Sequence, residues 1–225
     1  MDDLGRKSVA ALVWFIIALG IFIFVPAWTF DYWQAWIYLC VFGASVTLIT
    51  WYLWKNDREL LERRVNVGPA AEKEKSQKRI QTCAAVAFIG TFLLPSLDHR
   101  FSWSSVPATI VILGDVLVTL GFFIVFLVFK ENTYSAGIIE VAAGQKVISS
   151  GPYARVRHPM YAGALIMLFG TPLALGSWWG LLLFTPMIIV IVWRLRDEEE
   201  FLLRNLPGYS EYREKVRYRL LPLVW

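Results

Sequence analysis

The chain has 225 residues, of which 57% are hydrophobic and only 18% are charged, and its formal net charge is +4. One soluble domain of this length cannot bury so much apolar side chain, so the composition excludes an ordinary soluble domain and indicates a polytopic membrane protein. The positive charge requires no nucleic acid as a partner, because Lys and Arg accumulate at the cytoplasmic ends of membrane spans, where they contact anionic lipids.

Long apolar runs predict the membrane-spanning helices. A fifth run, Met160 to Trp193, is too long for one crossing and contains TPLALGSWWG, whose proline, glycines and tryptophans indicate a turn at the membrane interface. We therefore expect an all-α fold with four transmembrane helices and a C-terminal transmembrane helical hairpin. The four single runs, each long enough to cross about 30 Å of hydrocarbon, are Val9 to Val25, Trp33 to Trp54, Ile80 to Leu97 and Val106 to Phe129.

The distribution of Lys and Arg predicts the orientation of these spans. If both termini are cytoplasmic, every basic cluster falls on the cytoplasmic side, and Arg100 is the only one of the 22 Lys and Arg residues that does not. We therefore expect a multi-pass protein with cytoplasmic N- and C-termini. The first apolar run has no clear cleavage site, which favours a retained helix over a signal peptide.

Two connectors between the spans differ in character. The segment Lys55 to Arg79 is rich in both signs of charge and has a Gly-Pro break, so we interpret it as a short surface helix and a mobile stretch, a solvated connector. The segment Lys130 to His158 is too long for a tight turn, and ordered loops of that length are often functional. We accordingly divide the chain into an N-terminal part, 1–129, and a core with the functional site, 130–225.

The core begins with the sequence GPYARVRHPMYAG, residues 151–163. Pro159 suits the first turn of a helix, since its missing N–H would be unpaired there. His158 then stands at a helix N-terminus, where free N–H groups and the helix dipole favour a carboxylate or phosphate. With Tyr161 on the first turn and Gly163 allowing close packing, this helix start suggests a pocket for a flat molecule with an anionic end.

A second polar cluster, WRLRDEEEFLL at residues 193–203, follows the hairpin. Its arginines and glutamates lie at helical spacing, which is also what surface ion pairs on a solvated helix would give. The hairpin topology adds that its polar groups share one membrane side with the start of the preceding helix. We therefore expect His158 and Tyr161 to lie near Glu199 and Glu200, where an acidic pair and free N–H groups could bind a zwitterion.

These two clusters, followed by the tail GYSEYREKVRYRLLP, resemble the superfamily of isoprenylcysteine carboxyl methyltransferases and phospholipid methyltransferases. The resemblance covers roughly Lys130 to Trp225 and is strongest to bacterial members. It implies an integral membrane methyltransferase, in a bacterial inner membrane, that uses S-adenosylmethionine without a Rossmann domain. The absence of a G-x-G-x-x-G motif is consistent with that implication.

The resemblance also implies which residues form the site. An arginine of eukaryotic carboxyl methyltransferases, four residues before the first paired glutamate, contacts the acceptor; here Leu195 occupies that position, between Arg194 and Arg196. These two arginines are the candidate catalytic residues, and the spacing to the glutamates favours Arg196. The cofactor pocket should lie on the cytoplasmic side and be formed by Gln145, Lys146, Val147, Ile148, Tyr153, His158, Pro159, Met160, Tyr161, Glu199 and Glu200, with Glu199 holding the ammonium.

The identity of the acceptor stays open. It should be lipophilic, and a carboxylate like that of an isoprenylcysteine needs only alignment and a cation, whereas a phospholipid amine also needs a group to take its proton. No Ser-His-Asp or metal-binding constellation stands out in the sequence, which suits this chemistry. The sequence does not indicate the oligomeric state.

Two other functions remain as alternatives. NADPH-dependent sterol reductases have a related core and tail but carry R-H-x-N-Y-x-G-D, where this chain has Met160 and Ala164 at the asparagine and aspartate positions. A non-catalytic membrane scaffold would require only ion pairs. Asp115, inside the fourth span, is either functional or a carboxyl group hydrogen-bonded within the bundle.

Overall fold

The computed structural model describes residues 3–65, 75–142 and 144–225, and all the regular elements in those ranges are helical. The all-α prediction is therefore confirmed for this part of the chain. The Gly-Pro break predicted at residues 68–69 lies outside the described residues. The α-helices are α1 (Asp3–Ala27), α2 (Trp33–Asn56), α3 (Arg58–Val65), α4 (Lys75–Phe101), α5 (Ala108–Glu131), α6 (Pro159–Ala174), α7 (Phe184–Asn205) and α8 (Tyr209–Lys215).

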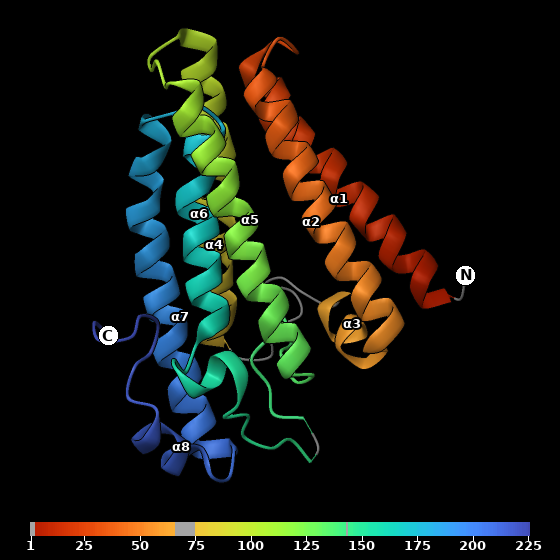
Figure 1. Ribbon diagram of the computed structural model, residues 1–225, viewed down its shortest axis with the longest axis vertical. Coiled ribbons are helices and arrows are strands. Elements are labelled where there is room, and N and C mark those ends of the chain that lie inside the picture. The colour runs from red at the N-terminus through yellow and green to blue at the C-terminus, as the bar shows by residue number, and fades with distance from the viewer. Residues whose placement is uncertain (1–2, 66–74, 143) are drawn as a thin grey trace.

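The long helices form a bundle with a side pair (Figure 1). Helices α4, α5, α6 and α7 run alongside one another, while α1 and α2 form a pair that leans away from them. Within the described residues, five helical segments are long and apolar enough to cross a membrane, namely α1, α2, α4, α5 and the continuous stretch Trp179–Asn205. With 16 residues, α6 is about 24 Å long and shorter than a full crossing.

The chain turns between α6 and α7 where the sequence predicts a hairpin. Helix α6 contains Pro172 and ends at Ala174, and Gly176 then adopts φ +69°, a left-handed conformation that glycine adopts without strain. The backbone N–H of Ser177 donates to the carbonyl oxygen of Pro172 over 2.9 Å. A 3₁₀ helix, Trp179–Leu183, leads into α7.

Glycines bring α5 and α6 into backbone contact. A methyl group on Gly114 would lie 2.3 Å from the backbone nitrogen of Ala174, and one on Gly121 would lie 2.6 Å from the carbonyl oxygen of Gly163. Real side chains cannot approach so closely, so both positions require glycine. This contact fixes the start of α6 beside the end of α5, although α6 itself is short.

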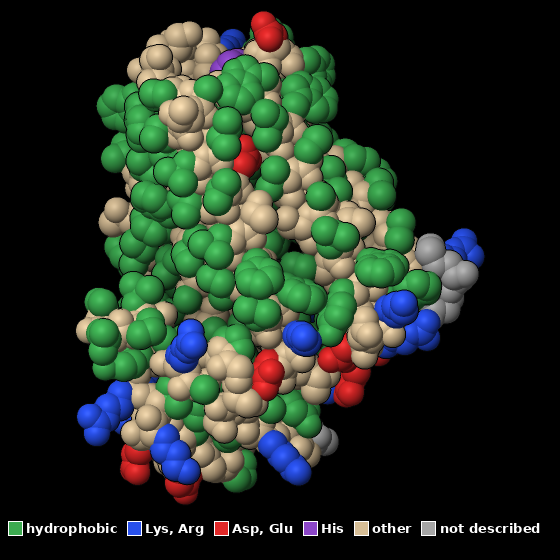
Figure 2. Space-filling model, viewed as in Figure 1, with side chains coloured by type: hydrophobic (Ala, Val, Ile, Leu, Met, Phe, Trp, Pro, Cys, Tyr) green, Lys and Arg blue, Asp and Glu red, His purple; other side chains and the backbone are tan. Residues whose placement is uncertain are grey.

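The connectors and the tail gather at one end of the molecule, which we call the basic end. It comprises α3, residues 132–158 and α8, and the Lys and Arg side chains visible in Figure 2 lie mostly toward it. Leu4 packs against the apolar cluster that contains Leu53 and Leu60, so the start of α1 lies on the same side. Arg100 lies at the opposite end, over the ring of Trp28.

Candidate active site

A polar cavity of about 800 Å³, partly open to solvent, lies at the basic end; we call it the first cavity. Its walls come from the loop after α5, the first turn of α6, the end of α7 and α8. Nine of the residues that the sequence suggests as cofactor ligands line it: Gln145, Lys146, Val147, Ile148, Tyr153, His158, Pro159, Met160 and Tyr161.

The start of α6 is held in place by the C-terminal tail. Pro159 is the first residue of α6 and His158 immediately precedes it, as the sequence predicts. The backbone N–H groups of Arg157 and His158 donate to the carbonyl oxygens of Tyr218 and Arg219, each over 2.9 Å. The tail therefore fixes the backbone of His158, whose side chain is buried and lines the first cavity.

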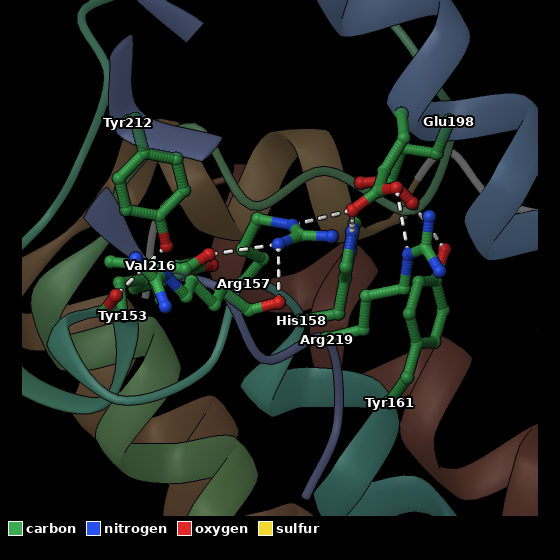
Figure 3. A network of polar contacts seen from close by, with 10 residues as sticks. Tyr153, Arg157, His158, Tyr161, Glu198, Tyr212, Val216 and Arg219 are labelled. Carbon is green, nitrogen blue, oxygen red and sulfur yellow. Dashed lines mark hydrogen bonds and ion pairs between the residues drawn. The ribbon is translucent and has the colours of Figure 1, made fainter. Parts of the chain in front are cut away.

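Glu199 forms the centre of a buried ion-pair network (Figure 3). Its Oε1 accepts a hydrogen bond from Nε of Arg157 over 2.6 Å, and its Oε2 accepts one from Nε of Arg219 over 2.9 Å. The ring Nε2 of His158 lies 3.3 Å from Oε1. Glu199 is 4% exposed and is absent from the residues that line the first cavity. Its charge is thus already balanced by cations from two other segments.

Glu198 is the acidic side chain at the end of α7 that faces the first cavity. Its Oε2 accepts a hydrogen bond from the hydroxyl of Tyr161 over 2.5 Å, and this hydroxyl accepts one from Nε of Arg194 over 3.0 Å. The ring of Tyr161 packs against that of His158, with 5.7 Å between their centroids. The sequence predicts Glu199 and Glu200 as cofactor ligands and does not indicate Glu198.

The two candidate arginines lie on different faces of α7. Arg194 also donates to Oε1 of Gln77 over 3.0 Å and to the carbonyl oxygen of Gly137 over 3.2 Å, which holds it beside the site. Arg196 is exposed and lines none of the cavities described, and exposed Glu200 forms an ion pair with Arg204. Arg194 therefore lies beside the first cavity through its bond to Tyr161, whereas the spacing to the glutamates in the sequence favours Arg196.

The helical period explains this difference. The buried residues of α7 include Met187, Ile191, Leu195 and Glu199, at intervals of four. Extending this stripe brings its neighbours at 194, 198 and 202 toward the bundle and turns 196 and 200 toward solvent. The buried stripe is thus the signal in the sequence that could have identified Glu198.

Tyrosines from the 3₁₀ helix before α6 and from α8 complete the first cavity. The hydroxyl of Tyr153, in the 3₁₀ helix Gly151–Ala154, accepts a hydrogen bond from Nδ2 of Asn132 over 2.9 Å. The hydroxyl of Tyr212 donates to the carbonyl oxygen of Tyr153 over 2.8 Å. Tyr209 also lines the cavity, and its buried hydroxyl has no hydrogen-bond partner in the part of the chain that the structure describes. Burial raises the pKa of Tyr209 well above its usual value, so it remains a neutral potential donor.

Much of this region is similar to known methyltransferases. Residues 109–208 match the family model for phospholipid methyltransferases. A probable protein-S-isoprenylcysteine O-methyltransferase of Oryza sativa subsp. indica is 32% identical over 131 residues, which are 55% of this chain and 64% of that protein. The protein-S-isoprenylcysteine O-methyltransferase of Schizosaccharomyces pombe is 36% identical over 76 residues, 31% of this chain and 30% of that protein.

These matches support the superfamily of isoprenylcysteine carboxyl methyltransferases and phospholipid methyltransferases for residues 109–208. It spans less than two thirds of the length of the curated relatives it matches. A Delta(14)-sterol reductase of Mus musculus is also similar, 33% identical over 92 residues, 39% of this chain and 22% of the reductase.

The superfamily match covers the elements that build most of the first cavity. Residues 109–208 include nearly all of α5, the loop after it, α6 and α7, whereas α8 follows the matched residues. Helices α1 to α4 precede them. Whatever α3 and α4 contribute to the site is therefore outside the matched superfamily region, and only the structure relates it to the site.

Proposed function

We propose that the chain is an integral membrane methyltransferase that uses S-adenosylmethionine and acts on a lipophilic acceptor, with transfer to a carboxylate. The observation that carries the proposal is a polar cavity at the end of an apolar bundle, formed by the superfamily region and lined by His158, Tyr161 and Glu198. A water-soluble donor can reach such a cavity from the aqueous side, while a lipophilic acceptor can arrive from the bilayer.

Several groups in the first cavity fit a zwitterionic nucleoside donor. Glu198 supplies a negative charge for an ammonium group, and the free N–H groups at the start of α6 suit a carboxylate. The unpaired hydroxyl of Tyr209 fits a polar group of the nucleoside. Residues Gln145 to Ile148 line the same space. When bound, S-adenosylmethionine supplies an electrophilic methyl group on a sulfonium.

Residues of the chain have to align the acceptor with the donor and exclude water. A carboxylate acceptor is ionised and nucleophilic at neutral pH, so the protein has to align it and exclude water rather than remove a proton. Arg194 lies beside Tyr161 and can position an anionic acceptor. Glu199 then acts as a positioning residue that holds the start of α6 and the tail together.

We further propose that the basic end faces the cytoplasm of a bacterium and that the chain lies in the inner membrane. The excess of Lys and Arg at this end supports that orientation. A soluble donor made in the cytoplasm would then meet the first cavity directly.

Ligand binding tests the proposed activity. The chain, purified in detergent, should be stabilised against thermal unfolding by S-adenosylhomocysteine, by about 2.7 kcal/mol at a hundred times the dissociation constant. The Glu198→Gln variant should lose most of this effect, and Glu200→Gln is the matched control on the exposed face. Stabilisation by NADPH instead would favour a reductase, which the similarity to the mouse protein keeps as the second candidate. Stabilisation by neither compound would favour a scaffold.

Transfer of a radiolabelled methyl group then identifies the acceptor class. We expect label in an S-prenylated cysteine acid and not in phosphatidylethanolamine presented in the same micelles. Label in the phospholipid would replace the carboxylate by an amine as the acceptor.

A further inference from the structure

A second cavity, of about 560 Å³, adjoins the first one at the basic end. The two cavities share wall residues, including Met160, Tyr161 and Glu198. Arg64 and Arg194 line the second cavity but not the first one. A molecule bound there would therefore lie next to one bound in the first cavity, with only shared side chains between them.

Helix α3 brings Arg64 to this cavity. The helix begins after Asp57, whose Oδ1 accepts a hydrogen bond from the backbone N–H of Leu60 over 3.0 Å. Leu60 and Leu61 are buried in an apolar cluster with Val128 and Phe129 of α5. Arg64 follows Leu60 by four residues and Leu61 by three, so it lies on the same helix face and points toward the bundle. The short helix expected in this connector is confirmed, but its face with Leu60 and Leu61 is buried rather than solvated; the stretch expected to be mobile lies largely in residues 66–74, outside the described ranges.

Arg64 is a largely enclosed cation that contacts a thioether and an aromatic ring among the residues that the structure describes. Its Nη2 lies 2.7 Å from Sδ of Met160, and its Cζ lies 4.3 Å from the centroid of the Phe129 ring. Its Nε is buried and has no hydrogen-bond partner among the described residues. Burial lowers the pKa of Arg64 to about 10, so the guanidinium stays charged at neutral pH. A thioether is a weak acceptor, and an enclosed charge with unsatisfied donors is costly, so an anion at this place would be stabilising.

The charges around the second cavity match a monoanion. Arg64 and Arg194 contribute two positive charges to its wall, and Glu198 contributes one negative charge. One positive charge thus remains in excess, and it would repel an ammonium headgroup. Arg194 is fixed by its bonds to Tyr161, Gln77 and Gly137, which leaves Arg64 as the guanidinium with the unsatisfied donor.

An apolar groove lies between α2 and α5 on the membrane-facing side. Helices α2 and α5 enclose about 730 Å³ between residues such as Ile49, Tyr52 and Phe126, and Figure 2 shows this side hollowed between the side pair and the bundle. Ile49 and Tyr52 also pack in the cluster that contains Phe129. A lipid chain in the groove would therefore lie beside the apolar cluster whose Phe129 ring Arg64 contacts.

We infer that Arg64 binds the carboxylate of a lipophilic acid in the second cavity and thereby selects acidic over amine acceptors. The inference rests on the proposed function, because it makes this acid the methyl acceptor. It adds a specificity residue from α3, a helix outside the superfamily match.

Direct binding tests the inference without relying on turnover. The probes are N-acetyl-S-farnesyl-cysteine and its neutral carboxamide, titrated into the full chain in detergent by calorimetry. Arg64→Gln should weaken binding of the acid about ten- to a hundredfold, the range of charge-assisted hydrogen bonds, and leave carboxamide binding unchanged. Arg58→Gln, the same change on the exposed part of α3, should bind both probes like wild type. Arg64→Lys keeps the charge but loses the planar guanidinium with its paired donors, so it should lose less affinity for the acid than Arg64→Gln. It replaces Arg64→Gln in the test if that variant does not fold.

The outcomes separate this inference from the proposed function. Equal acid affinity in wild type and the Arg64 variants would overturn it, and so would an equal loss for acid and carboxamide, because that would indicate a packing effect. S-adenosylhomocysteine is titrated into the same samples. If it binds while the wild type does not prefer acid over carboxamide, the role of Arg64 is wrong and the methyltransferase proposal stands. If it does not bind, the proposed function fails, and an Arg64-dependent preference for the acid would still establish the anion site.

Discussion

Arg157 donates from Nε to Oε1 of Glu199 over 2.6 Å, and both side chains are almost fully buried. The same guanidinium donates from Nη1 to the carbonyl oxygens of Val216 and Arg217, each over 2.8 Å. Arg219 binds the other oxygen of Glu199. One carboxylate therefore connects the start of α6, the end of α7 and the C-terminal tail, in addition to the backbone bonds between the tail and residues 157–158.

Removing the charge of Glu199 should loosen this junction. In Glu199→Gln, Arg157 stays buried without a counter-charge, which should cost about 3–5 kcal/mol of stability. We expect a lower thermal midpoint and faster proteolysis after α8, measured on the protein in detergent. Glu200→Gln removes a charge from the next residue, which is exposed, and should behave like wild type. A Glu199→Gln protein with unchanged stability and protease resistance would show that the junction does not hold the tail.

Tyr209 should affect ligand binding but not folding. Its buried hydroxyl has no partner, so Tyr209→Phe removes an unsatisfied polar group and should leave stability unchanged or slightly increased. If the hydroxyl binds the donor, the same variant should bind S-adenosylhomocysteine about two- to tenfold more weakly by calorimetry, the range of a neutral hydrogen bond. Destabilised Tyr209→Phe, or unchanged affinity, would remove this hydroxyl from the site.

Local signals in the sequence predicted most of the fold. Apolar runs located the long helices to within a few residues, and proline and glycine marked both the start of α6 and the turn after it. These features depend on neighbours along the chain, which is why a single sequence reveals them. Residues 145–148, Tyr153 and residues 158–161 line one cavity because one loop leads directly into one helix, as the sequence predicts.

Contacts between distant segments could not be predicted in this way. Arg64 meets Met160, 96 positions later, only because the Leu60 and Leu61 face of α3 packs against α5. The choice between Glu198 and Glu199 depended on the rotation of α7, which spacing to nearby arginines did not determine. Both contacts depend on which way a helix faces, and packing decides that.

Backbone contact between α5 and α6 should make Gly114 intolerant of a side chain. A methyl group there would lie 2.3 Å from the nitrogen and 2.8 Å from the Cα of Ala174, so the helices must separate. We expect Gly114→Ala to lower stability by roughly 1–3 kcal/mol or more, as overpacking does. Gly20 of α1 has no atom within 4 Å of that position, and Gly20→Ala should be neutral or stabilising in the same thermal assay. Equal stability of the two variants would contradict the close contact.

Cysteine labelling should establish the proposed orientation. Ser149 at the basic end and Ser105 at the opposite end are both exposed. In a background that lacks Cys40 and Cys83, a membrane-impermeant maleimide added to intact cells should label Ser105→Cys but not Ser149→Cys. Opening the cells should make Ser149→Cys reactive. The reverse pattern would place the basic end outside the cytoplasm.

The two arginines of α7 should differ in their effect on turnover. Arg194 binds the hydroxyl of Tyr161, and Arg196 is exposed about 200° away around the helix. Arg194→Gln should therefore reduce methyl transfer to a prenylcysteine acid at least tenfold, because a charge-assisted contact is lost, while Arg196→Gln should lie within twofold of wild type. Binding of S-adenosylhomocysteine to both variants separates an acceptor role from damage to the first cavity. A selective loss of turnover in Arg196→Gln would return the role to the residue that the sequence spacing favoured.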